Sequence, residues 1–373
     1  MNIATLKEIK DNENRVGLTP QGTEKLTQKN HQVIVQKNAG NGAGFSNKEY
    51  IDAGAEILDD PKEIVKKSDI LVKVKEPLES EYGLLELFKG KTLFTYLHLS
   101  GVPKSLTKKL LENRITGIAY ETVENNGTLP LLAPMSQVAG VLAIQYGAEY
   151  LQKKYGGRGI TLGRIDNTPT AKVIVIGGGV VGCTSAATAA GMGSSVKLFE
   201  IDDEKIKKLK EKYSEYENIE IIKSSSETIS ENIKDADLVV GAVLIAGAKA
   251  PVVVNKDMVH SMKKGSVIVD VAIDQGGCVF GSCPTSHTNP ICTKENGIIY
   301  CCVPNMPGQV ALQSTQALTN STLPYLIKLA DKGMAALKTD PGFLKGLNTY
   351  NGKIVNKVIA KDLDMMDLYQ EIN

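Results

Sequence analysis

The stretch Ala171-Lys-Val-Ile-Val-Ile176 runs directly into Gly177-Gly-Gly-Val-Val-Gly182, and this junction decides the fold of the residues around it. The continuous apolar run predicts a strand buried inside a parallel sheet. Gly177, Gly179 and Gly182 fit the pattern G-x-G-x-x-G. In that pattern the first glycine allows a tight turn, the second lets the backbone approach a pyrophosphate, and the third lets a helix pack close to the sheet. The junction therefore predicts a Rossmann unit that binds a dinucleotide.

A predicted helix and a second predicted strand follow this loop. The small residues of Cys183–Met192 indicate the helix, whose N-terminus would direct unpaired N–H groups and a positive dipole end at the phosphates. Ser195–Phe199 indicates the strand, and Glu200 follows it, 18 residues beyond the third glycine. A carboxylate there can accept hydrogen bonds from the adenosine ribose and would repel the 2′-phosphate of NADP, so NAD is favoured. Three lysines moderate that preference: Lys205, Lys207 and Lys208.

The order of these features decides between two interpretations. An isolated G-x-G-x-x-G is a weak signal, and a Rossmann-like fold need not bind a dinucleotide. Here a strand, the glycines, a helix, a second strand and an acid follow one another within residues 171–200. That order favours a bound cofactor over a fold without one.

Length and composition limit the class of protein. A chain of 373 residues is too long for one ordinary core and predicts two domains. Its 43 Lys and Arg nearly balance its 42 Asp and Glu, which gives no electrostatic reason to expect nucleic acid or an anionic membrane as a partner. The apolar runs are strand-sized and the first ten residues lack a signal-peptide core, so we expect no membrane span and a cytoplasmic location. The six cysteines form no C-x-x-C pair, and we expect reduced thiols and no metal site.

Both halves of the chain alternate predicted strands and helices, as in an open parallel α/β sheet. Residues 309–373 contain too few predicted strands for a core of their own. We therefore expect two Rossmann-like doubly wound domains: residues 1–130 with 310–373 for the substrate, and residues 131–309 for NAD. Two local expectations concern helices. Ser136 could cap a helix that continues to Leu151, and Pro324 should bend or restart a long helix over Gln309–Lys332.

Three polar residues in the first half are candidates for substrate binding or catalysis: one lies in a predicted loop, and two follow apolar runs. Arg15 lies in a loop where a guanidinium could clamp a carboxylate, although a solvated arginine is the commoner interpretation of one such residue. Lys75 follows the run Ile70–Val74, at a carboxyl edge where open α/β sheets bind ligands, or simply as a charge at the sheet margin. His98 follows Leu93–Leu97 and suits acid–base chemistry near neutral pH, with a structural histidine as the equal alternative.

Three more candidates follow predicted strands in the second half. Asp270 lies within or at the end of the strand that starts at Val267, and it could be structural. Asp274 falls in the loop that follows, where it could face the substrate and the nicotinamide. Asn305 comes after the run Ile298–Val303, and its amide could bind the nicotinamide carboxamide or serve a turn.

Several stretches resemble the NAD-dependent alanine dehydrogenases. They are Asn12-Glu-Asn-Arg-Val16, Val74-Lys-Glu-Pro77, Phe94-Thr-Tyr-Leu-His-Leu99, Tyr120-Glu-Thr-Val123, Pro134-Met-Ser136, Asp270-Val-Ala-Ile-Asp-Gln-Gly-Gly-Cys278 and Asn305-Met-Pro-Gly308. The resemblance covers nearly the whole chain in the family's order. It implies oxidative deamination of L-alanine to pyruvate and ammonium with reduction of NAD⁺, and the reverse amination. It also implies a homohexamer of two-domain subunits, in which the C-terminal segment returns to the first domain.

The resemblance also implies roles for single residues. Those matching Arg15 and Lys75 hold the substrate, the one matching His98 is the acid–base, and the one matching Asp274 assists at the reacting centre. The implied cofactor contacts are Ser136, Gly177, Gly179, Val180, Val181, Gly182, Glu200, Lys205, Ser224, Val243 and Asn305. Cys283 and Leu312 depart from the family, which usually has arginine at both positions.

Three alternatives remain open at this point. The nearest is the NAD(H)-binding component of a proton-translocating transhydrogenase, which would not need the set of Arg15, Lys75 and His98. A dehydrogenase of another amino acid is the second. A protein that kept the fold but lost turnover is the third.

Overall fold

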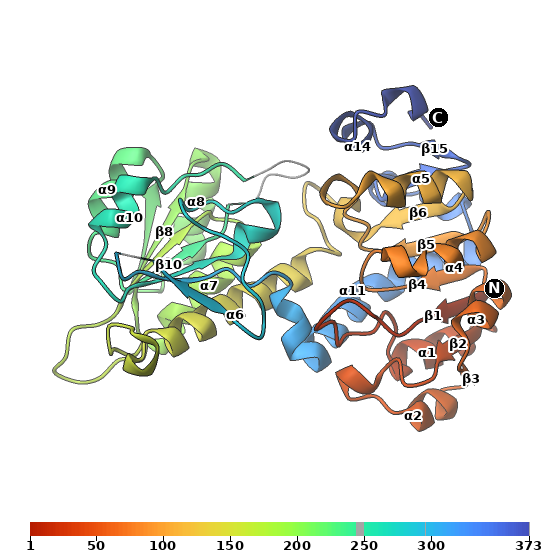
Figure 1. The fold of residues 1–373 in the computed structure, drawn as a ribbon, viewed down its shortest axis with the longest axis horizontal. Coiled ribbons are helices and arrows are strands. Elements are labelled where there is room, and N and C mark those ends of the chain that lie inside the picture. The colour runs from red at the N-terminus through yellow and green to blue at the C-terminus, as the bar shows by residue number, and fades with distance from the viewer. Residues whose placement is uncertain (244–249, 295, 373) are drawn as a thin grey trace. The chain divides into compact units, whose positions relative to one another are not determined.

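The computed structural model describes residues 1–243, 250–294 and 296–372. The chain forms two compact units (Figure 1). The first unit consists of Met1–Met135 together with Pro307–Asn373, and the second consists of Ser136–Met306.

The first unit contains a sheet with the strand order β15-β14-β6-β5-β4-β1-β2-β3. Its strands are β1 (Asn2–Thr5), β2 (Gln32–Gln36), β3 (Glu56–Leu58), β4 (Ile70–Val72), β5 (Thr92–Thr95), β6 (Thr116–Ala119), β14 (Leu347–Tyr350) and β15 (Lys353–Ile354). Strands β1 to β6 are parallel, whereas β14 pairs antiparallel with β6. The C-terminal segment therefore completes the sheet of the first unit, which confirms the predicted return of the chain.

Helices connect these strands and cover the sheet. They are α1 (Pro20–Thr27), α2 (Asn47–Asp52), α3 (Pro61–Lys67), α4 (Tyr82–Leu87), α5 (Lys104–Glu112), α11 (Ala311–Lys332), α12 (Ala335–Lys338), α13 (Pro341–Leu344) and α14 (Lys357–Asp362). Local sequence explains where they start: Thr19 caps α1 by accepting a hydrogen bond from the Gly22 amide, with Pro20 in the first turn. Fully buried side chains such as Phe88, Leu93 and Leu106 form the core beneath them.

The second unit contains a sheet with the strand order β12-β13-β11-β10-β7-β8-β9. Its strands are β7 (Lys172–Ile176), β8 (Ser195–Glu200), β9 (Ile219–Lys223), β10 (Leu238–Gly241), β11 (Val267–Asp270), β12 (Ile291–Thr293) and β13 (Ile299–Cys301). Its helices are α6 (Ala133–Tyr150), which begins just before the unit, α7 (Val180–Met192), α8 (Asp203–Lys212), α9 (Ser226–Ile233) and α10 (Lys256–Ser261). All neighbouring pairs are parallel except β12 with β13.

Both sheets share one topology. In each, the first strand lies between its second and its fourth, so the order reverses between β1 and β4 in the first unit and between β7 and β10 in the second. Both units are therefore doubly wound, as predicted. Open α/β sheets bind ligands outside the carboxyl ends of their strands at this reversal.

One of the two helix predictions was wrong. Helix α6 begins at Ala133, so Ser136 lies inside its first turn and is not its cap. Pro134, which is tolerated only near the start of a helix, was the signal for the earlier boundary. Helix α11 continues through Pro324, so of the two predicted alternatives, a bend or a restart, the restart is excluded. The residue four positions earlier, Asn320, is exposed, so the carbonyl that loses its partner at the proline can bond to water.

Candidate functional site

The glycine loop between β7 and α7 has close backbone contacts at two of its glycines. Gly177 has a φ of +108°, and a Cβ there would lie 2.5 Å from the Ala242 carbonyl oxygen. A Cβ on Gly182 would lie 1.8 Å from the Gly177 carbonyl oxygen. These two glycines therefore serve the turn and the close approach of α7 to the loop.

Gly179 faces open space. It is the N-cap residue of α7, no side chain caps this end of the helix, and a Cβ at Gly179 would meet no heavy atom within 4 Å. Val180 and Val181 begin the helix. The first N–H groups of this thirteen-residue helix have no side-chain cap and lie at its positive end, next to a glycine that leaves open space. This arrangement fits the pyrophosphate of a dinucleotide.

Glu200 ties this loop to the neighbouring strand. It is buried at the end of β8, where one carboxylate oxygen accepts from the Gly178 amide at 3.1 Å. The other oxygen accepts from the Ile201 amide at 2.7 Å and from the Asp202 amide at 3.0 Å. Ser224 follows β9, and its amide donates to the Glu200 carbonyl at 2.8 Å. The acid and the serine therefore lie together beside the glycine loop.

Val243 lies beside the same loop, and Ser136 lies on a helix that contacts α7. Val243 follows β10, and its amide nitrogen lies 3.2 Å from where a Cβ on Gly177 would stand. The Ser185 hydroxyl of α7 donates to the Gly140 carbonyl of α6 at 3.0 Å, so these two helices are in direct contact (Figure 1). Ser136 lies one turn before Gly140 on α6.

The remaining predicted cofactor residues lie on other elements of this unit. Lys205 is exposed in the first turn of α8, where its amide donates to the Asp202 carboxylate at 2.8 Å. Asn305 follows β13 and has a φ of +55°, a left-handed conformation that asparagine tolerates.

The two aspartates after β11 differ in their surroundings. Asp270 is fully buried, and its Oδ2 accepts from the Cys278 amide at 2.8 Å, the Val279 amide at 3.1 Å and the Ser282 hydroxyl at 2.7 Å. These bonds favour the structural interpretation of Asp270. Asp274 is exposed on the short helix Val271–Gln275.

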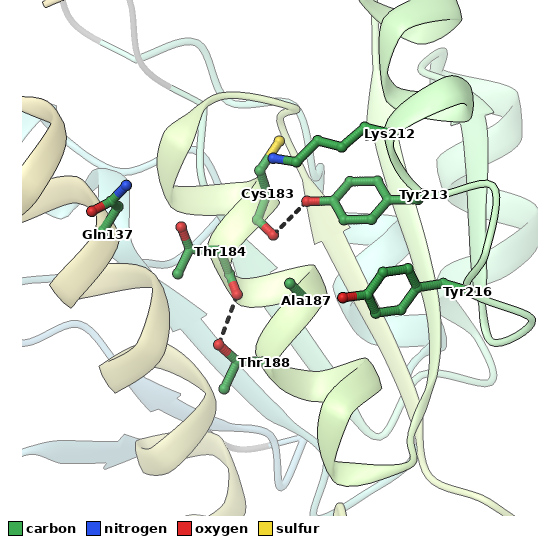
Figure 2. Close-up of a pocket in the computed structure, with 8 residues that line it drawn as sticks. All are labelled: Gln137, Cys183, Thr184, Ala187, Thr188, Lys212, Tyr213 and Tyr216. Carbon is green, nitrogen blue, oxygen red and sulfur yellow. Dashed lines mark hydrogen bonds between the residues drawn. The ribbon is translucent and has the colours of Figure 1, made fainter.

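A pocket of about 540 Å³ opens on another face of α7 (Figure 2). It is lined by Gln137, Cys183, Thr184, Ala187, Thr188, Lys212, Tyr213 and Tyr216. Three of its hydroxyls already have partners: Tyr213 donates to the Cys183 carbonyl at 2.9 Å, Thr188 to the Thr184 carbonyl at 2.8 Å, and Thr184 to the Val180 carbonyl at 2.8 Å. None of the predicted cofactor residues lines this pocket, so the glycine loop remains the predicted dinucleotide site.

Four adjacent strands bring the candidate residues of the first unit to one edge. Strands β1, β4, β5 and β6 are parallel neighbours, so their carboxyl ends lie side by side. The segments that leave these ends carry Arg15, Lys75, His98 and Glu121, respectively. The structure therefore gathers the three residues predicted from the sequence and adds a carboxylate to them.

Arg15 is buried and held by Glu13. The Arg15 Nε donates to Glu13 Oε1 at 2.7 Å, and Nη2 donates to Oε2 at 2.5 Å. Burial opposes the charge, but these bonds outweigh it and raise the pKa of Arg15 above its ordinary value. The hydroxyl of Thr315, from the returning helix α11, accepts from the Val16 amide at 3.3 Å. The loop arginine is thus a fixed cation and not a solvated one.

Two lysines near the end of β4 have different roles. Lys73 is 1% exposed, and its Nζ lies 3.2 Å from Glu8 Oε2 and 3.0 Å from Glu81 Oε1. Burial favours the neutral amine, but the two carboxylates raise the pKa of Lys73, so it serves as a buried structural cation. Lys75 is half-buried beyond the end of the strand, and its carbonyl accepts from the Thr95 hydroxyl at 3.1 Å.

His98 stands beside a buried tyrosine. The rings of Tyr96 and His98 are parallel to within 4°, with centroids 5.5 Å apart. The Tyr96 hydroxyl donates to the Leu131 carbonyl at 2.6 Å, which fixes the ring against which the imidazole lies. The His98 side chain is 39% exposed, so the imidazole combines one packed face with access to solvent.

The sequence interpretation assigned no role to Glu13 or Glu121. Glu13 lies two residues from Arg15, and a carboxylate so close to a buried guanidinium was an available signal. Glu121 directly follows the first residue after β6, the parallel neighbour of β5, so the strand order would have placed it beside His98.

The described residues contain neither a metal site nor a membrane-spanning helix. Among them, no group of three or more His, Cys, Asp or Glu side chains could hold a metal ion. No helix in these ranges combines the length and the apolar character needed to cross a bilayer.

Two doubly wound units, one with a glycine loop shaped for a pyrophosphate, place the chain among the dinucleotide-binding α/β proteins. The family described as "Alanine dehydrogenase/PNT, C-terminal domain" matches residues 143–357, and its N-terminal counterpart matches residues 4–139. An alanine dehydrogenase of Mycolicibacterium smegmatis is 48% identical over 360 residues, which are 96% of this chain and 95% of that protein. The chain therefore belongs to the alanine dehydrogenase/PNT family.

Two solved structures agree with this membership. The structure of an L-alanine dehydrogenase matches with a TM-score of 0.92 and 44% identity, over 99% of this chain and 100% of that one. The structure of a transhydrogenase from Sinorhizobium meliloti matches with a TM-score of 0.81 at 22% identity, over 96% and 99%. The second likeness is one of fold alone.

Proposed function

We propose that this protein is an NAD-dependent oxidoreductase that deaminates L-alanine to pyruvate and ammonium and catalyses the reverse amination. The observation that carries the proposal is the meeting of Arg15, Lys75 and His98 at one sheet edge, in a chain 48% identical to an alanine dehydrogenase. Arginine and lysine supply the charge to hold a small anionic substrate, and histidine supplies a proton acceptor.

The first unit would bind the substrate. Arg15, with its guanidinium plane fixed by Glu13, holds the carboxylate, and Lys75 stabilises negative charge on the substrate oxygen. Loss of hydride from the substrate Cα leaves an iminium carbon, to which water adds. His98 accepts the proton of that water, and ammonia then leaves the carbon as the carbonyl forms.

The second unit would bind the cofactor. NAD⁺, when bound, supplies the acceptor for the hydride. The amides of the first turn of α7, which follows Gly179, would hold the pyrophosphate, and Glu200 would hold the adenosine ribose. Ser136, Lys205, Ser224, Val243 and Asn305 are proposed as further contacts, and Asp274 is proposed to assist at the reacting centre.

The transhydrogenase component is the less supported alternative. Its structural match, at 22% identity, concerns the fold alone, whereas the match to an L-alanine dehydrogenase reaches 44%. That alternative also gives no role to Arg15, Lys75 and His98 at the carboxyl ends of the strands in the first unit. We further propose, from the family resemblance, a homohexamer located in the cytoplasm.

A substrate panel tests the function directly. Purified protein, supplied with NAD⁺ and each of several amino acids in turn, should form NADH with L-alanine at the highest kcat/KM. NADH absorbance gives the rate, and pyruvate with ammonium should consume NADH in the reverse direction. Turnover of another amino acid in preference to alanine, or none at all, would contradict the proposal.

Replacing Glu200 by alanine tests the cofactor preference. Like charges about 4 Å apart near a protein surface repel by about 4 kcal/mol, so loss of the carboxylate should favour NADP⁺. We expect the ratio of kcat/KM for NADP⁺ to that for NAD⁺ to rise at least about tenfold, since about 1.4 kcal/mol suffices for that. Glu204→Ala removes an exposed carboxylate from α8 and should leave the ratio unchanged. An unaltered ratio in Glu200→Ala would contradict the proposal that Glu200 binds the adenosine ribose.

A further inference from the structure

His98 occupies a backbone conformation that a histidine rarely adopts. Its φ is +47° and its ψ is +35°, in the left-handed region, where the Cβ of an L-residue approaches its own carbonyl. Such residues persist only where the surroundings hold them, and they gather at active sites. The turn directs the imidazole out of the line of β5, so whatever holds this turn also sets the position of the imidazole.

The carboxylate of Glu121 makes the short contacts to this turn. Its Oε1 accepts from the His98 amide at 2.6 Å, and both of its oxygens lie 3.3 Å from the Leu97 amide. The same Oε1 lies 4.0 Å from His98 Nδ1, which is too long for a hydrogen bond. The hydrogen bonds of Glu121 therefore go to the backbone of the turn, and the ring meets this carboxylate only as a charge 4.0 Å from Nδ1.

Other groups around the turn complete its support. The Gly101 amide donates to the His98 carbonyl at 2.7 Å, and the Ser100 hydroxyl donates to the Asp362 carboxylate of α14 at 2.9 Å. Neither of these two bonds engages the amides of Leu97 and His98. Only Glu121, among the described hydrogen bonds, engages the amides of Leu97 and His98 from a neighbouring strand end.

We infer that Glu121 is a positioning residue for His98: its carboxylate holds the amides of Leu97 and His98 and so keeps the imidazole parallel to the Tyr96 ring. This inference rests on the proposed function for the catalytic use of His98. The placement of the ring itself can be measured without any turnover. A further consequence is that one acceptor oxygen at this position suffices, since Oε1 reaches both amides.

Three substitutions separate positioning from general stability. Glu121→Ala removes the acceptor, and Glu121→Met does so with a side chain of similar length. Glu121→Gln keeps an oxygen that can accept from both amides. We expect Ala and Met to lower kcat for deamination at least about tenfold while KM for alanine changes less than about threefold, since Arg15 and Lys75 still hold the substrate. Gln should restore most of the kcat.

Nuclear magnetic resonance of the histidines supplies the readout that needs no activity. The chain has four histidines, so His98→Asn identifies the His98 resonance by its absence. In Glu121→Ala and Glu121→Met this resonance should move as the imidazole leaves the Tyr96 ring, and in Glu121→Gln it should stay. Glu124→Ala is the matched control, because that half-buried carboxylate pairs with Lys345 at 2.7 Å, away from the turn, and its loss should alter neither kcat nor the spectrum.

The outcomes distinguish this inference from the proposed function. A His98 resonance and a kcat that remain at wild-type values in Glu121→Ala or Glu121→Met would overturn the inference. The Met variant answers the question if the Ala variant fails to fold. Absence of NADH formation by the wild type with alanine would overturn the proposed function, while the resonances would still decide whether Glu121 positions the ring.

Discussion

His98→Ala should lose deamination by about a hundredfold to ten-thousandfold while NADH still binds with wild-type affinity. A positioned acid–base typically contributes a factor of this size, and the substitution removes the only group proposed to take the proton of the attacking water. The cofactor residues belong to the other unit, so the Kd for NADH should not change. Stopped-flow or steady-state absorbance gives the rate, and NADH fluorescence titration gives the Kd.

Two controls separate the chemistry from the strained backbone. Asparagine tolerates the left-handed conformation that alanine resists, so His98→Asn should fold as the wild type does and lose activity to the same extent. Imidazole added to the buffer should restore part of the rate of His98→Ala. His260→Ala, at an exposed position at the end of α10, should leave the rate unchanged. Near-normal deamination by His98→Ala would end the assignment of His98 as the acid–base.

The dinucleotide unit could be predicted because its signals are local. The apolar run of β7, the glycines and the small residues of α7 follow one another without interruption, and each has one conformational meaning. Polar residues at strand ends were also visible, because β4 and β5 are apolar runs that stop at Lys75 and His98. The parallel topology then brings those ends together without any further information.

The carboxylate that holds the His98 turn could not be predicted in this way. Glu121 reaches His98 only because β6 pairs with β5, and pairing is a long-range property that a single sequence does not display. Short strands raise the same difficulty. The four-residue β1 is an inner strand between β4 and β2, yet its alternation is too brief to indicate a strand. Ser136 shows the opposite error, since a good capping residue stood inside a helix that Pro134 had already begun.

Gly182→Ala should unfold the glycine loop or displace α7. Its Cβ would overlap the Gly177 carbonyl oxygen, and because that carbonyl is backbone it cannot move aside as a flexible side chain could. Overpacking of this kind costs about 3 kcal/mol or more, so the free energy of unfolding should fall by at least that amount and NADH binding should fall with it. Chemical denaturation and NADH titration measure the two effects.

Gly179→Ala should weaken NADH binding without lowering stability, and this contrast with Gly182→Ala is the sharper test of the dinucleotide site. Gly179 has a φ of −76°, which alanine adopts without strain, and a Cβ there meets no protein atom within 4 Å. Stability should therefore stay at the wild-type value. The methyl group would occupy the space assigned to the pyrophosphate, so the Kd for NADH should rise at least about tenfold. Gly191→Ala, exposed on the same helix, should stabilise the protein by about 0.5–1 kcal/mol without affecting the Kd. An unchanged Kd in Gly179→Ala would mean that the open space above the loop is not where the pyrophosphate binds, however well the rest of the motif fits.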